Sequence, residues 1–177
     1  TDEIKKLKSM ERERDVDTLT GLYNRRGLTE KLDELFADRE ALGQSAVIMI
    51  DADGLKQIND TYGHEKGDIY LRKIADIINN FGIKSSIASR QGGDEFVLFL
   101  YGYDSEEELM KAIETLQYIQ SNSKATLEKG LTVPLRFSLG YAIAKEDSEY
   151  QDLFKIADEE MYKNKTERKK KQRENKE

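Results

Sequence analysis

Hydrophobic positions along the chain follow two strand patterns and one hairpin pattern. The run Ser45-Ala-Val-Ile-Met-Ile50 is almost wholly apolar, which is typical of a strand buried on both faces. Strict alternation from Leu135 to Ile143 predicts a half-buried strand. Two short apolar runs, 86–89 and 96–100, flank Arg90-Gln-Gly-Gly-Asp94, and this pattern predicts a β-hairpin.

Four further stretches carry apolar residues at helical spacing, and Ser105 with Glu108 forms a capping-box signature before the third of them. The order helix, strand, helix, hairpin, helix, strand, helix predicts an α/β sandwich of ferredoxin-like type, with an antiparallel hairpin at its centre. The predicted apolar helix faces are Leu28, Leu32, Leu35 and Phe36; Leu71, Ile74, Ala75 and Ile78; Leu109, Ala112, Ile113 and Leu116; and Leu153, Ile156, Ala157 and Met161.

The two ends of the 177-residue chain differ from its middle. Residues 1–14 alternate basic and acidic side chains, which indicates the end of a helix that connects to an upstream segment. A short coiled coil that continues from that segment is an alternative form of this helix. The first residue is Thr1, so we expect the chain to be a piece of a longer protein. We expect one domain over residues 15–170 and a charged, disordered tail over 171–177.

Composition excludes several classes of function. There is no cysteine and only one histidine, so disulfides, thiol nucleophiles and Cys- or His-rich metal sites are ruled out. No apolar run approaches the ~20 residues of a membrane-spanning helix. The net charge of −6 argues against a general nucleic-acid binder but permits a protein that handles a small polyanion through a metal ion.

Two acidic groups lie at the ends of predicted buried strands: Asp51 and Asp53 after the first strand, and Asp94 and Glu95 in the hairpin turn. Adjacent strands would bring these carboxylates within a few ångströms, where they would repel unless a cation or a proton is shared. Oxygen ligands without His or Cys favour Mg²⁺ or Mn²⁺. The alternative is that Asp53 caps a turn and Glu95 pairs with a lysine.

Gly92 and Gly93 permit a positive φ or a close approach of the backbone to a ligand, although a tight hairpin would need the same glycines. Further segments of note, in chain order, are Asp17-Thr-Leu-Thr-Gly-Leu-Tyr-Asn-Arg-Arg26, Asp51-Ala-Asp-Gly-Leu-Lys-Gln-Ile-Asn-Asp60, Tyr62-Gly-His64, Gly67-Asp68, Arg90-Gln-Gly-Gly-Asp-Glu-Phe96, Ser138-Leu-Gly140, Ala157-Asp158, Met161-Tyr162 and Lys165. In these segments, which occur in the right order over about residues 15–170, the chain resembles the GGDEF domains, the catalytic domains of diguanylate cyclases.

The resemblance implies a metal site and a catalytic role for the acidic groups. Asp51, the backbone carbonyl of Ala52 and Asp94 would bind two Mg²⁺ (or Mn²⁺) ions on the phosphates of GTP. Asp94 or Glu95 would help to deprotonate the attacking 3′-hydroxyl. Lys56 would touch the phosphates; its alternative role is that of a solvated helix residue.

The resemblance also implies how the substrate is bound. Asn59 and Asp68 would read guanine, and the alternative for Asp68 is to cap the helix that carries Leu71. Lys165 and Lys169 would contact the γ-phosphate.

The chain departs from the family pattern at three places. Leu55 stands where the family usually has a bulky aromatic, and Lys169 stands where it has an arginine, so the bidentate fork is lost. Ile83 and Ser86 stand where many members carry the RxxD product-inhibition site, so we expect that site to be absent.

The activity implied is the condensation of two GTP into cyclic di-GMP and two pyrophosphates by a transient homodimer, in the cytoplasm. An upstream sensory domain in the same chain would control this activity. We expect the domain itself to contact neither nucleic acid nor a membrane. Three alternatives stay open: a catalytically silent GTP-binding regulatory domain, a purely structural or dimerising domain, and synthesis of a mixed cyclic dinucleotide. Asp68 disfavours the last, because family members that accept ATP commonly have serine there.

Overall fold

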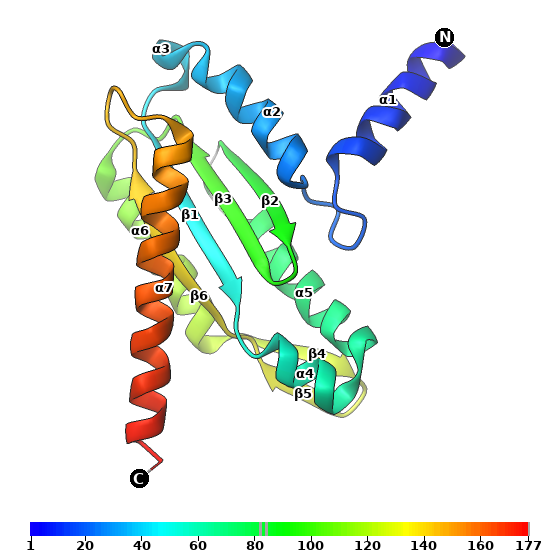
Figure 1. Cartoon of the computed structure of the whole chain (residues 1–177), viewed down its shortest axis with the longest axis vertical. Helices are drawn as coiled ribbons and strands as arrows, with labels where there is room; N and C mark the ends of the chain where they lie inside the picture. The colour runs from blue at the N-terminus through cyan, green and yellow to red at the C-terminus, as the bar shows by residue number, and fades with distance from the viewer. Residues whose placement is uncertain (82, 84, 177) are drawn as a thin grey trace.

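The computed structural model describes residues 1–81, 83 and 85–176, and its centre is a four-stranded antiparallel sheet (Figure 1). The strands are β1 (Ser45–Ala52), β2 (Ser86–Gly92), β3 (Glu95–Tyr101) and β6 (Phe137–Ile143). Their order is β2-β3-β1-β6, so the predicted hairpin supplies one edge strand and one central strand. The predicted α/β sandwich with an antiparallel hairpin is confirmed, but the hairpin is not at the centre: the central pair is β3 with β1, and β2 is at the edge.

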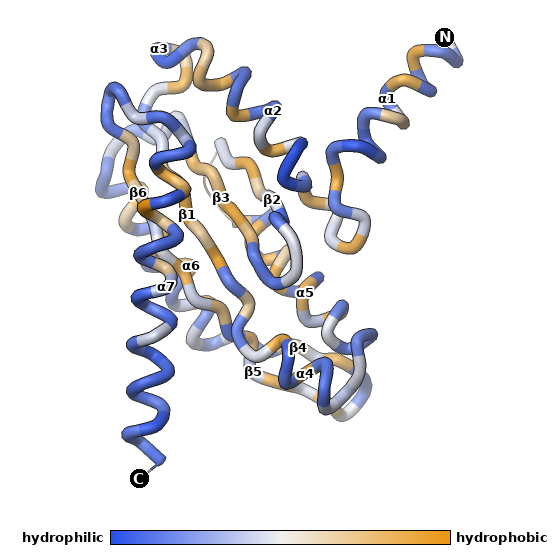
Figure 2. Tube along the Cα trace, viewed as in Figure 1, coloured by the Kyte–Doolittle hydropathy of each residue, from blue (hydrophilic) through white to orange (hydrophobic). Residues whose placement is uncertain are grey.

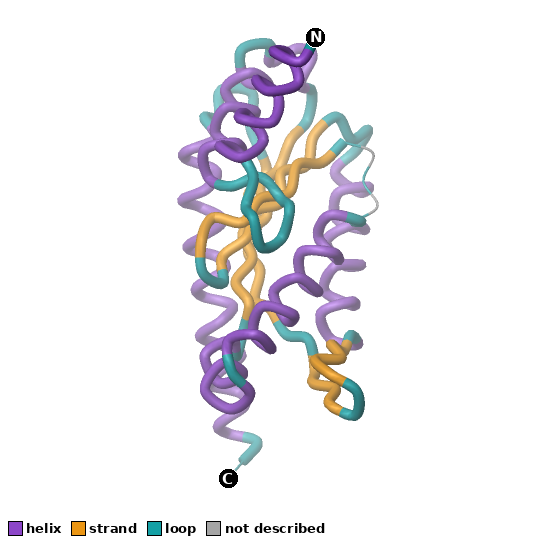
Figure 3. Tube along the Cα trace, turned by 90° about the vertical axis from the view of Figure 1, so that its right-hand side faces the viewer, coloured by secondary structure: helices purple, strands orange, loops and turns teal. Residues whose placement is uncertain are grey.

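Helices cover both faces of the sheet (Figures 1 and 3). Alternate residues of β1 face opposite sides, because successive side chains of a strand point to opposite faces. Ala46 and Ile48 pack in one core with α5 (His64–Asn79) and α6 (Glu106–Asn122). Val47 and Met49 pack in a second core with α2 (Arg25–Phe36) and α7 (Tyr150–Glu174).

Strand β6 is more buried than its alternating pattern predicted. Its first four residues are all buried, although we expected one face to be open. The reason is the close packing of α7 on this strand: a side chain at Gly140 would place its Cβ 2.1 Å from the backbone nitrogen of Met161. Small residues at Ser138 and Gly140 therefore bring the helix backbone close to the sheet.

The two ends of the chain are helical. Helix α1 (Asp2–Asp15) buries no residue, and Ile4, Leu7 and Met10 are each more than half exposed. Helix α7 continues to Glu174, so our expectation of a disordered tail is wrong for residues 171–174; residue 177 lies outside the described residues. Lys, Gln, Arg and Glu are good helix formers, which explains a helical end without apolar packing (Figure 2).

The sequence pattern did not predict four smaller elements. Helix α4 (Leu55–Tyr62) lies between Gly54 and Gly63, which both have a positive φ and which separate it from β1 and α5. The four elements are α3 (Arg39–Leu42), α4 (Leu55–Tyr62), β4 (Lys124–Glu128) and β5 (Leu131–Pro134).

The capping box before α6 is confirmed in part: Ser105 Oγ accepts from Glu108 N at 3.2 Å, but the Glu108 carboxylate accepts from Asp104 N.

Over the described residues, no helix combines the length and the apolar character that a membrane crossing requires.

Candidate active site

The two acidic groups meet at one end of the sheet. Asp51 is the register partner of Glu95 in the β1–β3 pair, and Ala52 N donates to the carbonyl oxygen of Asp94 at 2.8 Å. Directly opposed residues of an antiparallel pair share a face of the sheet, so Asp51 and Glu95 point to the side that α7 covers. The proximity predicted from the ends of the two strands is confirmed.

Asp51 lies in an environment that opposes its negative charge. The pKa of Asp51 is raised to about 6: burial and the neighbouring Asp94 carboxyl raise it, and together they outweigh the lowering effect of the hydrogen bond from Lys165. Among the described residues, Asp51 Oδ1 is buried without a hydrogen-bond partner, and the same is true of Asp53 Oδ1. A buried carboxylate with an unused oxygen is suited to accept a cation.

Two cations of α7 reach this acidic cluster. Lys165 Nζ donates to the Asp51 carboxylate and lies 3.9 Å from Asp53 Oδ1. Burial lowers the pKa of Lys165, but the hydrogen bond and the charge of Asp51 outweigh it, so the pKa of Lys165 is raised. Arg168 Nη1 donates to the carbonyl of Phe137 at 2.6 Å and lies 3.4 Å from Asp53 Oδ2.

A cleft of about 1040 Å³ opens between these acids and α7. Asp51 and Glu95 contribute one part of its lining, and Lys165, Lys169 and Arg173 contribute another. Acidic and basic walls in one cleft suit a polyanion that arrives with a metal ion.

The donors present fit a magnesium or manganese ion that binds together with its substrate. Over the described residues there is no group of three His, Cys, Asp or Glu side chains that could hold a metal alone. Mg²⁺ is commonly held by one or two carboxylates together with substrate phosphates. Asp51, with its unused oxygen, and the adjacent Asp94 provide that partial set.

The turn that carries Asp94 is held from behind. Gly92 and Gly93 have φ values of 148° and 52°, so the positive φ expected at these glycines is confirmed. Arg90 donates from Nε and Nη2 to the carbonyl of Gly93 at 3.0 and 2.7 Å, and from Nη1 to Asp17 Oδ1 at 3.1 Å. The segment that follows α1 is therefore tied to the turn, a contact that sequence analysis missed although Asp17 and Arg90 both lie in the matching segments.

The predicted guanine readers come together on α4 and α5, outside the lining of the cleft. A Cβ at Gly67 would lie 1.8 Å from Asn59 Oδ1, so Asn59 packs against the residue next to Asp68. Asn59 Oδ1 is buried without a partner in the described part of the chain. Asp68 lies inside α5, which begins at His64 with Gly63 as its N-cap, so the capping alternative for Asp68 is wrong.

The two other lysines predicted to bind phosphate are exposed, and the positions of the expected missing inhibition site belong to the core and to a strand. Lys56 is exposed in the first turn of α4 and forms no ion pair within the described residues, and Lys169 is exposed where it lines the cleft. At the predicted position of the missing inhibition site, Ile83 packs against the core and Ser86 begins β2; residue 84 lies outside the described residues.

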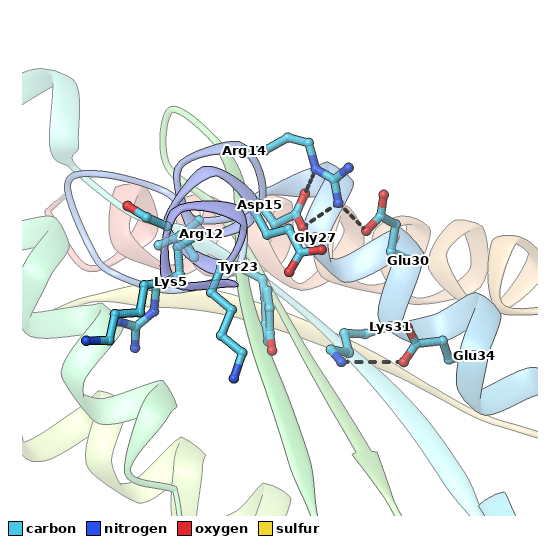
Figure 4. A pocket seen from close by; sticks show the side chains of 13 residues that line it. Lys5, Arg12, Arg14, Asp15, Tyr23, Gly27, Glu30, Lys31 and Glu34 are labelled. Atoms are coloured by element: carbon cyan, nitrogen blue, oxygen red, sulfur yellow. Dashed lines mark hydrogen bonds and ion pairs between the residues drawn. The ribbon is translucent and has the colours of Figure 1, made fainter. Parts of the chain in front are cut away.

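A second cleft, of about 670 Å³, lies between α1 and α2 (Figure 4). Four of the charged side chains that line it form two ion pairs: Arg14 with Glu30 at 3.0 Å and Lys31 with Glu34 at 3.4 Å. A Cβ at Gly27 would lie 2.2 Å from the carbonyl oxygen of Asp15, so α1 ends in tight contact with α2. The acids Asp15 and Glu30 of this cleft are both paired with Arg14, unlike Asp51 with its unused oxygen in the first cleft.

The sheet order and the paired carboxylates at its end define a palm-type α/β domain. The sequence profile of the family described as "Diguanylate cyclase, GGDEF domain" matches residues 14–171, and the chain belongs to this family. It is 37% identical over 152 residues to the diguanylate cyclase DgcN of Escherichia coli and 34% identical over 148 residues to the diguanylate cyclase DosC. These matches cover 86% and 83% of the chain but 37% and 32% of the relatives, so the chain spans about a third of their length.

Solved structures agree with this assignment. The GGDEF domain of TpbB (YfiN) from Pseudomonas aeruginosa matches with a TM-score of 0.77 and 31% identity, covering 86% of this chain and 89% of that one. The diguanylate cyclase SiaD from the same species, solved with its activator SiaC, matches with a TM-score of 0.78 and 25% identity, covering 94% and 64%. The coiled coil and GGDEF domain of DgcB from Caulobacter crescentus, solved with cyclic di-GMP, shares the fold at a TM-score of 0.80 and 23% identity, covering 92% and 86%.

Proposed function

We propose that this domain condenses two GTP molecules into cyclic di-GMP and two pyrophosphates. The observation that carries the proposal is the pairing of Asp51 with the neighbouring Asp94, because Asp51 lines the same cleft as Lys165 and Lys169. The family assignment and the relatives named as diguanylate cyclases support the same reaction.

Asp51, the carbonyl of Ala52 and Asp94 would hold two Mg²⁺ or Mn²⁺ ions. When bound, the metal supplies charge neutralisation on the phosphates and lowers the pKa of the attacking hydroxyl. Asp94 or Glu95 accepts the proton of the 3′-hydroxyl of one GTP. The freed oxygen forms a bond to the α-phosphorus of the other GTP, the bond to the bridging oxygen breaks, and pyrophosphate leaves. A second transfer in the opposite sense closes the ring.

Lysines hold the phosphates in this scheme. Lys165 and Lys169 line the cleft, where they would bind the γ-phosphate end, and Lys56 at the start of α4 would approach from the other side. The point charge of Lys169 replaces the fork of an arginine, so its contribution is electrostatic rather than bidentate.

Asn59 and Asp68 would select guanine. A carboxylate at Asp68 can accept from both N1–H and the 2-amino group of guanine, whereas adenine offers neither donor there. Asn59 Oδ1, which lies next to Gly67 and is buried without a partner among the described residues, would be a further acceptor for a donor of guanine.

Two domains must cooperate, because each GTP supplies a hydroxyl that attacks the other. The two-fold symmetry of the product fits an isologous pair of identical domains. Since the chain spans about a third of its curated relatives, we assign control of this pairing to a sensory segment outside it. We also propose a cytoplasmic location, because the proposed reaction consumes GTP.

The test is to incubate the protein with GTP and Mg²⁺ and to identify the products by mass spectrometry. We expect cyclic di-GMP and pyrophosphate, both dependent on the divalent ion. GTP that binds but stays intact would instead assign the chain to the silent, regulatory members of the family.

A further inference from the structure

The second half of α7 is held on the sheet by polar contacts. Met161 is its last buried apolar residue, yet Asn164 Nδ2 donates to Leu139 O at 2.8 Å and Arg168 Nη1 donates to Phe137 O at 2.6 Å. These two carbonyl contacts lie on either side of Lys165 along the helix. The ammonium group of Lys165 is therefore held in register with Asp51 by its own helix.

The ammonium group of Lys165 contacts the Asp51 carboxylate, to which a metal ion would also bind. It donates to Oδ2, and Oδ1 is buried without a partner among the described residues. Asp53 also has a buried Oδ1 without a partner in the described residues, but its Oδ2 accepts from Ser138 Oγ at 2.8 Å and lies near Arg168 instead of bonding to Lys165. A divalent ion on Asp51 Oδ1 would lie within a few ångströms of the ammonium on Oδ2, and two cations so close repel each other strongly, so metal binding favours release of Lys165 from this carboxylate.

A triphosphate offers Lys165 a different partner. Lys165 lines the same cleft as Lys169 and Arg173, which is the basic wall that phosphates would contact. Phosphate oxygens in this cleft therefore attract the ammonium away from Asp51. They also add ligands for the metal, so both effects favour the exchange.

We infer that Lys165 makes divalent-cation binding depend on the nucleotide. Without a triphosphate, Lys165 occupies Asp51; with a triphosphate, it moves to the phosphates and leaves the carboxylate to the metal. Lys165 is a positioning residue in this respect, because it acts through Asp51. The coupling is reciprocal, so the metal strengthens nucleotide binding by the same factor. The inference rests on the proposed function only in placing a nucleoside triphosphate in this cleft.

The test is to measure Mn²⁺ affinity at pH 8 by electron paramagnetic resonance, with and without a GTP analogue that cannot be cleaved at the α-phosphate. Wild-type protein should bind free Mn²⁺ weakly and bind it much more tightly with the analogue. Lys165→Met should bind free Mn²⁺ about tenfold more tightly than wild type and gain less from the analogue. Lys165→Gln repeats the measurement if the first variant is unfolded by circular dichroism.

Lys163→Met is the matched control, because it removes the same charge from an exposed position of the same helix. It should leave free Mn²⁺ affinity unchanged, and the gain of Lys165→Met should vanish when Asp51→Asn is added. The inference is overturned if Lys165→Met binds free Mn²⁺ no more tightly than wild type, if Lys163→Met shows the same gain, or if the gain survives in the double variant. Failure of the proposed function is a separate result, namely intact GTP in the product assay despite the predicted Mn²⁺ pattern.

Discussion

Asp51 is where the demands of stability and of the proposed chemistry oppose each other. Its side chain is buried, faces Asp94 and has one oxygen without a partner in the described residues. A neutral side chain would be better tolerated in the metal-free protein, but only the carboxylate can hold a divalent ion. The raised pKa of Asp51 expresses this conflict and gives it a measurable pH dependence.

The free energy of unfolding of the metal-free protein should fall as Asp51 ionises. Its pKa is about 6 in the folded protein against 3.8 ordinarily, so its stabilising contribution is complete below about pH 4 and is lost as pH rises through 6. The Asp51→Asn variant has no carboxyl group to ionise at this position, so its free energy of unfolding does not fall in this way. Its stability relative to wild type should therefore rise by about 2–3 kcal/mol between pH 4 and pH 7, measured by urea unfolding in chelator. A difference that does not vary with pH would contradict the assignment.

Asp94→Asn and Asp51→Asn should each abolish turnover while the fold survives. Each removes a carboxylate that the proposed metal site needs, and several kcal/mol of transition-state stabilisation correspond to a fall in kcat of about 10³-fold or more. The measurement is the rate of cyclic di-GMP formation at saturating Mg²⁺, with circular dichroism as the control for folding. Near-normal turnover in either variant would refute the metal assignment.

GTP should be preferred over ATP by about 10⁴-fold in kcat/KM, because mismatched base edges would leave buried polar groups unpaired. Gly67→Ala should weaken this preference, since the added Cβ would lie 1.8 Å from Asn59 Oδ1. Competition assays with both nucleotides measure the ratio. Comparable use of ATP and GTP by the wild-type protein would show that Asn59 and Asp68 do not read the base.

At the scale of elements, the packing of α7 on β6 determines where the basic side chains lie. Gly140 lets the helix backbone approach the strand, and Asn164 and Arg168 continue the contact beyond the last buried apolar residue. The position of Lys165 over Asp51 thus depends on a glycine in another element.

Gly140→Ala should lower the free energy of unfolding by about 3 kcal/mol, because the new Cβ would meet Met161 N at 2.1 Å and Ala157 O at 2.4 Å. Gly21→Ala is the comparison: it has a φ of 75° but open space around it, so we expect a loss of about 1 kcal/mol from backbone strain alone. Urea unfolding of both variants tests the order. Equal losses would show that α7 can shift away from β6 without cost.

The sequence predicted the structure well where a strand is buried on both faces and ends at a glycine turn or an acidic residue. The apolar run of β1 and the Gly92-Gly93 turn predicted both strand ends and the meeting of Asp51 with Asp94. The β4–β5 hairpin was missed because its strands are only five and four residues long and each offers just two alternating apolar positions. The contact of Lys165 with Asp51 was beyond prediction, since it depends on the tertiary distance that Gly140 permits.

At the scale of the whole molecule, the cleft lined by Asp51, Glu95 and Lys165 provides one GTP site for the proposed reaction, which needs two. Helix α1 projects from the domain with Ile4, Leu7 and Met10 exposed, and its end is held by Arg14 and Glu30 at α2 (Figure 4). A 14-residue helix is too short to form a stable coiled coil alone. We therefore expect a monomer or a weak dimer.

Fusing a strong parallel coiled coil before Thr1 should raise specific activity by supplying a high effective concentration of the second domain. Inserting two or four residues at the junction rotates the domains relative to each other, so activity should vary with the inserted length. Fusions that are stable dimers yet no more active than the unfused chain in any phase would contradict a reaction across two domains.

The most direct measurement of the central claim is the specific rate of cyclic di-GMP formation from GTP and Mg²⁺ across a wide range of protein concentrations. Sedimentation should record the oligomeric state in parallel. The account predicts that cyclic di-GMP is formed and that the rate per domain rises steeply as monomers pair. Absence of the product at every concentration, or a constant rate per domain where sedimentation shows only monomer, would contradict it.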